Sequence, residues 1–234
     1  MGNTDADSGK AMVWEHLQHK KLRKRGGNEV VSINVAYNMD CMEYMKSLPD
    51  KAFDLAVVDP PYGINITDSG RLKKYNANKT KRDSEPPQKE YFEELRRVSK
   101  NQIIWGGNYF DLPPTRCFLI WDKQQPEGVT FSSCEFAWTS FDQSAKTFYY
   151  SMLTDKDFRF HPTQKPVALY AWIFSRYAKQ GDKILDTHLG SGSSRIAAYD
   201  AGFDFVGLEI DKDYFDKQEE RFAAHTAQCS LFVK

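Results

Sequence analysis

Short apolar segments alternate with amphipathic segments along most of this chain. Several apolar segments are rich in strand formers and too short for helices: residues 30–37, 53–58, 102–105, 117–121, 183–186 and 203–208. Apolar residues also recur at helical spacing, in residues 42–48, 89–99, 166–177 and 193–201. This alternation predicts an α/β fold, a doubly wound and mostly parallel Rossmann-like sheet with helices on both faces.

Other regions depart from the alternation. Residues 1–28 are polar and carry the basic run Lys20–Arg25, which predicts an N-terminal tail, so that residues 29–234 form one domain. Residues 64–88 are too polar to pack and predict a basic loop directly after the turn at residues 59–63. Residues 123–160 are rich in aromatic residues and less regular, and they predict strands only near 135–140 and 146–152.

Composition narrows the class of protein. Of the 234 residues, 41% are apolar and 27% charged, which is ordinary for a globular protein, and the formal net charge is zero. A polyanionic partner would therefore need a local basic patch. No apolar run approaches membrane-spanning length and no signal peptide is visible, which predicts a cytoplasmic protein without a membrane partner. The four cysteines lack C-x-x-C spacing, so we expect reduced thiols and no metal site.

The most informative motif is Asp59-Pro60-Pro61-Tyr62-Gly63. It follows the apolar run at 53–58, so Asp59 should lie at the carboxyl end of a buried strand, where open α/β sheets bind ligands. The prolines offer carbonyls but no N–H, and Tyr62 adds a flat face for stacking. A carboxylate, a carbonyl and an aromatic ring suit a planar amino group such as that of a nucleobase. An ordinary strand-ending turn remains the alternative for this motif alone.

A second motif lies near the C-terminus. Asp186 ends a predicted strand, the turn Thr187–Gly192 follows, and Glu209 ends the next strand. Glycines let a backbone approach a ligand, and an acid about twenty residues on suits ribose hydroxyls. Arg195 replaces the third glycine of the dinucleotide fingerprint, which favours a nucleoside ligand without a pyrophosphate. With Asp186 suited to an ammonium group, the pattern indicates S-adenosylmethionine (SAM).

Together these motifs resemble those of the SAM-dependent DNA amino-methyltransferases, and of the adenine-N(6) group in particular. The matching segments are Asp59–Tyr62, His161–Pro166 and Asp186–Gly192, and the resemblance covers roughly residues 30–220. The glycine turn follows the Asp-Pro-Pro-Tyr turn, as in the circularly permuted β group. Leu189 stands where the family usually has Phe, and Thr187 where it commonly has Pro.

The resemblance implies roles for individual residues. Asp59, Pro60 and Tyr62 would bind the amino group and the base, which must be flipped out of the duplex. Asp40 and Glu209 would face the adenosine of SAM, and Asp186 and Lys165 its methionine end. The glycine turn itself would line the cofactor site with Leu189, Gly190, Ser191 and Gly192. Simpler readings stay open for two of them, because Asp40 suits a helix N-cap and Lys165 a solvated helix start.

DNA is the partner that the resemblance implies. The densest basic patch lies in the predicted loop, in Arg71, Lys73, Lys74, Lys79, Lys81 and Arg82. Residues 123–160 are short for a target-recognition segment, and a homodimer, a restriction endonuclease partner and a bacterial or phage source stay open. The alternatives are cytosine-N(4) methyltransferases, usually with Ser at the position of Asp59, glutamine methyltransferases, usually with Asn, and a SAM-binding subunit that docks on nucleic acid without turnover.

Overall fold

The computed structural model describes residues 32–64, 85–126, 128, 132–151 and 159–232. Its elements, in chain order, are β1 (Asn34–Tyr37), α2 (Cys41–Lys46), β2 (Phe53–Val58), α3 (Lys89–Val98), β3 (Ser99–Trp105), the 3₁₀ turn η3 (Gly107–Tyr109), β4 (Phe118–Asp122), β5 (Cys134–Thr139), β6 (Lys146–Tyr149), α4 (Val167–Tyr177), β7 (Lys183–Asp186), α5 (Ser193–Asp200), β8 (Asp204–Leu208) and α6 (Lys212–Phe232). The predicted tail and the predicted basic loop, with its six basic residues, lie outside the described residues.

The described strands form one eight-stranded sheet in the order β1-β8-β7-β2-β3-β5-β4-β6. Neighbours from β1 to β3 pair in parallel, β5 is antiparallel to both β3 and β4, and β6 runs parallel to β4. Within this sheet β5 alone runs against the others, so the predicted mostly parallel sheet is confirmed. The described part of residues 123–160 extends this sheet through β5 and β6.

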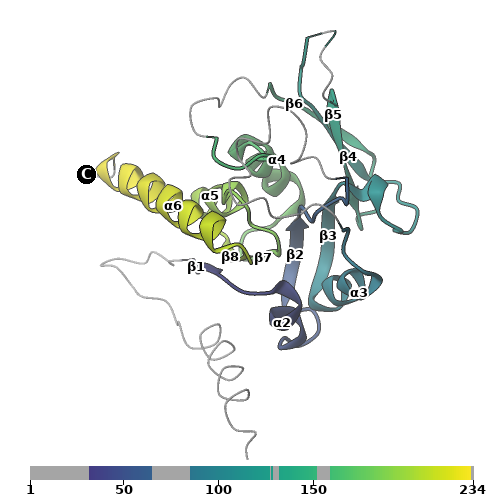
Figure 1. The fold of residues 1–234 in the computed structure, drawn as a ribbon, viewed down its shortest axis with the longest axis horizontal. Coiled ribbons are helices and arrows are strands. Elements are labelled where there is room, and N and C mark those ends of the chain that lie inside the picture. Colours follow the sequence, from purple (N-terminus) through teal and green to yellow (C-terminus); the bar gives the residue numbers. More distant parts are fainter. Residues whose placement is uncertain (1–31, 65–84, 127, 129–131, 152–158, 233–234) are drawn as a thin grey trace, which may run out of the picture.

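Helices cover both faces of the sheet (Figure 1). In β2, Leu55 and Val57 join a core cluster with α4 and α5, whereas Ala56 and Val58 join a second cluster with α2 and α3. A strand that buries both faces reads as a continuous apolar run, which is why β2 shows no polar alternation after Asp54. The predicted doubly wound arrangement is therefore confirmed.

The structure departs from the prediction at the start of β3 and in the C-terminal helix. Strand β3 begins at Ser99 instead of residue 102, because α3 ends at Val98 and the Ser99 hydroxyl caps the Leu95 carbonyl at 2.5 Å. The long helix α6 was not predicted at all. Arg195, in the position of the missing glycine, donates to Asn34, Gln218 and Glu219 and so ties α5 to both β1 and α6.

Candidate active site

Acidic residues gather at the carboxyl edge of the sheet. Strands β1, β8, β7 and β2 are consecutive neighbours, and their carboxyl ends lead into Asp40, Glu209, Asp186 and Asp59 respectively. Because parallel strands end at the same edge, residues far apart in sequence meet there. The sequence placed all four acids at strand ends, and the sheet order brings those ends side by side.

Both carboxylate oxygens of Asp59 are engaged. The Tyr62 hydroxyl donates to Oδ1 at 2.6 Å, and the Lys165 ammonium donates to Oδ2 at 2.5 Å. The side chain of Asp59 is only 17% exposed. Burial raises the pKa of Asp59 above its usual range, since desolvation of the carboxylate outweighs the attraction of Lys165.

The ring of Tyr62 lies between the exit of β3 and a second tyrosine. A Cβ at Gly106 would lie 2.2 Å from Tyr62 Cε1, so the ring rests directly on that glycine, whose φ is +69°. Tyr109 stacks on Tyr62 with ring centroids 5.0 Å apart, and the edge of Phe110 closes a third side. The predicted stacking face of Tyr62 is thus covered by Tyr109 in this structure, and its role toward a base stays a prediction.

The glycine turn is shaped by its backbone. Gly190 and Gly192 have φ of +52° and +75°, values that favour glycine. The Gly190 amide donates to Glu209 Oε2 at 2.9 Å, and the Leu189 amide donates to the Leu208 carbonyl at 2.8 Å. From α6, Arg221 donates to the Ser191 carbonyl at 2.8 Å, so the helix that the sequence did not predict holds this turn in place.

Asp186 is buried beneath the turn, with only 1% of its surface exposed. Its Oδ2 accepts from the Ser194 hydroxyl at 2.5 Å and its Oδ1 from the His188 amide at 3.0 Å. Burial raises the pKa of Asp186 to about 7, although both hydrogen bonds favour the charged form. These contacts stabilise the turn, and the predicted contact with an ammonium group stays a prediction.

Asp40 and Glu209 both hold backbone amides. Asp40 is the N-cap of α2, its Oδ1 accepting from Met42 N at 2.7 Å, as the simpler reading of the sequence had it. Glu209 Oε1 accepts from Asp211 N at 2.8 Å, which fixes the carboxylate between the glycine turn and the start of α6. Next to it, Ile210 is 65% exposed. An exposed apolar side chain beside the predicted ribose acid is a candidate contact that the sequence reasoning did not identify.

The segment His161–Pro166 joins the two predicted motifs. A Cβ on Gly190 would lie 3.4 Å from His161 Nε2, so the segment begins against the glycine turn. It ends at Lys165, which reaches Asp59. The ammonium also lies 3.0 Å from Glu135 Oε2 and 3.3 Å from the Tyr62 hydroxyl oxygen. These contacts lie on the Asp59 side of the site, and the predicted role of Lys165 in binding the cofactor stays a prediction.

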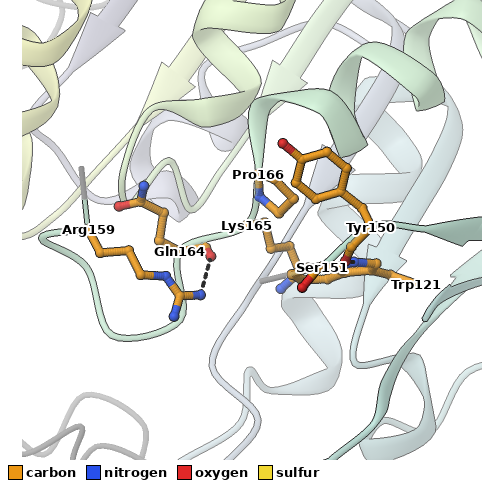
Figure 2. Close-up of a pocket in the computed structure, with 7 residues that line it drawn as sticks. All are labelled: Trp121, Tyr150, Ser151, Arg159, Gln164, Lys165 and Pro166. Atoms are coloured by element: carbon orange, nitrogen blue, oxygen red, sulfur yellow. Dashed lines mark hydrogen bonds between the residues drawn. The ribbon is translucent and has the colours of Figure 1, made fainter. Parts of the chain in front are cut away.

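A hollow adjoins Lys165 on the side of β4. It is lined by Trp121, Tyr150, Ser151, Arg159, Gln164, Lys165 and Pro166. Lys165 and Trp121 are almost fully buried in this lining. Figure 2 shows Arg159 beside Gln164, to whose carbonyl oxygen it donates at 3.3 Å. The Trp121 indole N–H donates to the Tyr150 carbonyl at 2.9 Å and joins the exit of β6 to β4.

Sequence reasoning missed Glu135 and Lys123. Lys123 Nζ lies 2.8 Å from Glu135 Oε1, so an ionic chain runs Lys123–Glu135–Lys165–Asp59. Burial opposes the charge of Glu135, but its two lysine partners prevail and hold its pKa well below the usual range. The available signal was a charged residue inside or just after a strand whose neighbours are aromatic.

The described residues show neither a metal site nor a membrane span. They contain no group of three or more His, Cys, Asp and Glu side chains placed to hold a metal ion. In the same residues, no helix has both the length and the apolar surface needed to cross a membrane.

Comparison with known proteins identifies the family and the fold of this chain. Residues 104–220 match a family described as DNA methylase. A protein named as a methylase, YubD of Escherichia coli (strain K12), is 26% identical over 208 residues, covering 79% of this chain and 88% of that protein.

Among solved structures, the M1.HpyAVI–SAM complex has a TM-score of 0.54 at 21% identity and covers 80% of this chain and 98% of its own. The cytosine-N4-specific PvuII DNA methyltransferase has a TM-score of 0.58 at 12% identity, covering 82% and 87%. At these identities the structures show a shared fold. Because the family match spans half of the sequence and includes the segment from Lys165 to the glycine turn, this chain belongs to the DNA methylase family, whose members use S-adenosylmethionine.

Proposed function

We propose that this chain transfers a methyl group from SAM to the exocyclic N6 amino group of adenine in DNA, on a base flipped out of the duplex. The choice of adenine is supported by one observation above all, the carboxylate of Asp59 in the Asp-Pro-Pro-Tyr turn at the edge of the sheet. The cytosine-N(4) enzymes that the chain resembles usually carry Ser there.

The residues at the carboxyl edge fit SAM. The acids surrounding the glycine turn suit a ligand that carries a sulfonium and an ammonium, and Gly190 and Gly192 let the backbone approach it. We assign Leu189–Gly192, Asp40 and Glu209 to its adenosine and Asp186 to its ammonium group. The bound cofactor supplies a methyl group that is already activated by the sulfonium.

The other half of the chemistry belongs to Asp59 and Pro60. The amino nitrogen of adenine is a poor nucleophile because its lone pair is delocalised into the ring. Asp59 and the Pro60 carbonyl each accept one of its N–H groups, which draws the nitrogen toward tetrahedral geometry and localises the lone pair. The hydrogen bond from Tyr62 to Oδ1 fixes the plane of the Asp59 carboxylate, so the acceptor is oriented before the amino group arrives.

Product analysis tests this assignment. The purified protein would be incubated with mixed-sequence duplex DNA and SAM carrying an isotopically labelled methyl group, and the DNA would be digested to nucleosides for mass spectrometry. The proposal expects label in N6-methyl-2′-deoxyadenosine. Label in N4-methyl-2′-deoxycytidine would establish the cytosine alternative, and absence of label in any nucleoside, with SAM binding intact, would favour a docking subunit.

A further inference from the structure

The ionic chain Lys123–Glu135–Lys165–Asp59 links the catalytic turn to the β4–β5 pair. Lys123 is 10% exposed, Glu135 22% and Lys165 only 2%. Trp121 of β4 pairs with Glu135 of β5, and Lys123 follows two residues later on the same face, so it is a diagonal neighbour of Glu135. The sheet thus places Glu135 next to the Lys165 ammonium and Lys123 next to Glu135.

The Lys165 ammonium treats its two carboxylate neighbours differently. It donates hydrogen bonds to Asp59 Oδ2 at 2.5 Å and to the Tyr62 hydroxyl at 3.3 Å, whereas Glu135 Oε2, 3.0 Å away, is an ion-pair partner that accepts no hydrogen bond within the described residues. The shortest of these contacts is made to the carboxylate that the proposed reaction needs as an acceptor. A neutral amino group entering the site must compete with a charge-assisted bond, which is about twice as strong as a neutral one.

Glu135 is a second anionic partner for Lys165, so the ammonium can leave Asp59 without becoming unpaired. If Asp59 were its single anionic neighbour, Lys165 could release Asp59 only by becoming an unpaired buried cation, which is strongly unfavourable. With Glu135 in place, the ammonium keeps an anionic partner while the target amino group takes over Asp59 Oδ2. Moving the ammonium away from Asp59 also favours methyl transfer, because positive charge develops on the attacking nitrogen.

We propose that Glu135, held by Lys123, is a positioning residue for methyl transfer, the second counter-ion that receives Lys165 when the target amino group binds Asp59. This inference rests on the proposed function of Asp59. It applies whichever base is methylated, because any exocyclic amino group meets the same ammonium.

The test compares three variants of the full chain. Glu135→Gln keeps the shape of the side chain and removes its charge. Lys123→Met/Glu135→Gln also removes the partner that the first change leaves unpaired. Glu94→Gln is the matched control, because Glu94 is also 22% exposed and pairs with a cation, Arg97 on α3, outside the site. Single-turnover methyl transfer, steady-state kcat and KM for SAM, and thermal unfolding would be measured for each.

We expect Glu135→Gln to lower kcat by about tenfold to a hundredfold, the scale of a small misplacement of the reacting groups, with little change in KM for SAM. The double variant should regain thermal stability but keep the low kcat, and Glu94→Gln should transfer at the wild-type rate. Recovery of kcat in the double variant would overturn the proposal, because Glu135 would then serve only to pair Lys123. If Glu135→Gln does not fold, the double variant decides alone. No transfer by the wild-type chain would instead contradict the proposed function.

Discussion

The contact between the Tyr62 ring and Gly106 gives a prediction, because the structure shows how far the ring must move when Gly106 is replaced by Ala. A Cβ at Gly106 would lie 2.2, 2.5 and 2.6 Å from three ring carbons of Tyr62. Ordinary carbon contacts begin at about 3.5 Å, so the nearest ring carbon must retreat by roughly 1.3 Å in Gly106→Ala. The tyrosine hydroxyl, which orients Asp59 through a 2.6 Å hydrogen bond, moves with the ring.

Misplacement by about 1 Å can cost about a hundredfold in rate, so we expect Gly106→Ala to lose methyl transfer by about that factor. SAM affinity should stay as in the wild type, because the glycine turn follows β7, whereas Gly106 follows β3. The positive φ of Gly106, +69°, adds about 1–2 kcal/mol of backbone strain to the folded state of the Ala variant. For a chain of this size each kcal/mol lowers Tm by about 2–4 °C.

Gly181→Ala is the matched control. Gly181 has φ of +90°, but apart from its two chain neighbours no atom of the described residues lies within 4 Å of the position of its added Cβ. It should show a similar loss of thermal stability with methyl transfer intact. Single-turnover transfer of labelled methyl groups, calorimetric titration of SAM and thermal unfolding would be run on both variants. If Gly106→Ala transfers methyl groups as fast as Gly181→Ala, the position of the Tyr62 ring does not control the reaction.

Three further results are expected. Glu209→Gln should weaken SAM binding by about 1–3 kcal/mol in calorimetry, because a charge-assisted bond to the cofactor is lost, and an unchanged affinity would leave Glu209 a structural role. The rate of methyl transfer should fall as the pH is lowered, with an apparent pKa above the usual Asp range. The reason is that burial raises the pKa of Asp59 and that only the ionised carboxylate is the assigned acceptor. A transfer rate that does not change with pH above the usual Asp range would refute this. Replacing lysines of the basic loop by Gln should flatten the salt dependence of DNA binding by up to about four units without changing SAM affinity, and an unchanged slope would move the DNA contact elsewhere. The lysines to be replaced are Lys73, Lys74, Lys79 and Lys81.

The sequence was most informative where local pattern decides structure. The run at 53–58 is apolar because β2 buries both faces. Because the run ends at Val58, the sequence alone predicted Asp59 at the carboxyl end of this strand. Helix α4 was predicted from its apolar spacing and confirmed at Val167–Tyr177. The alternation of strands and helices was enough to predict a doubly wound sheet, since a parallel connection requires a crossover.

What the sequence did not predict depends on contacts between distant residues. Lys165 and Asp59 are 106 residues apart, and nothing local distinguishes Lys165 from a solvated lysine at a helix start. Glu135 and Lys123 lie in or beside strands of the irregular segment, where charge usually faces solvent. Helix α6 combines charged residues with few apolar ones, and it is held by contacts of Arg195 and Arg221 that only the folded chain reveals.

In the proposed reaction, Asp59 accepts a hydrogen bond from the target amino group and does not bind the cofactor. Single-turnover methyl transfer by Asp59→Ala, measured together with the SAM affinity of this variant, is the decisive experiment. We expect transfer to be abolished while SAM binding stays within about tenfold of the wild type, because the lost carboxylate acts on the reacting nitrogen alone. An Ala variant that keeps most of the wild-type transfer rate would contradict it.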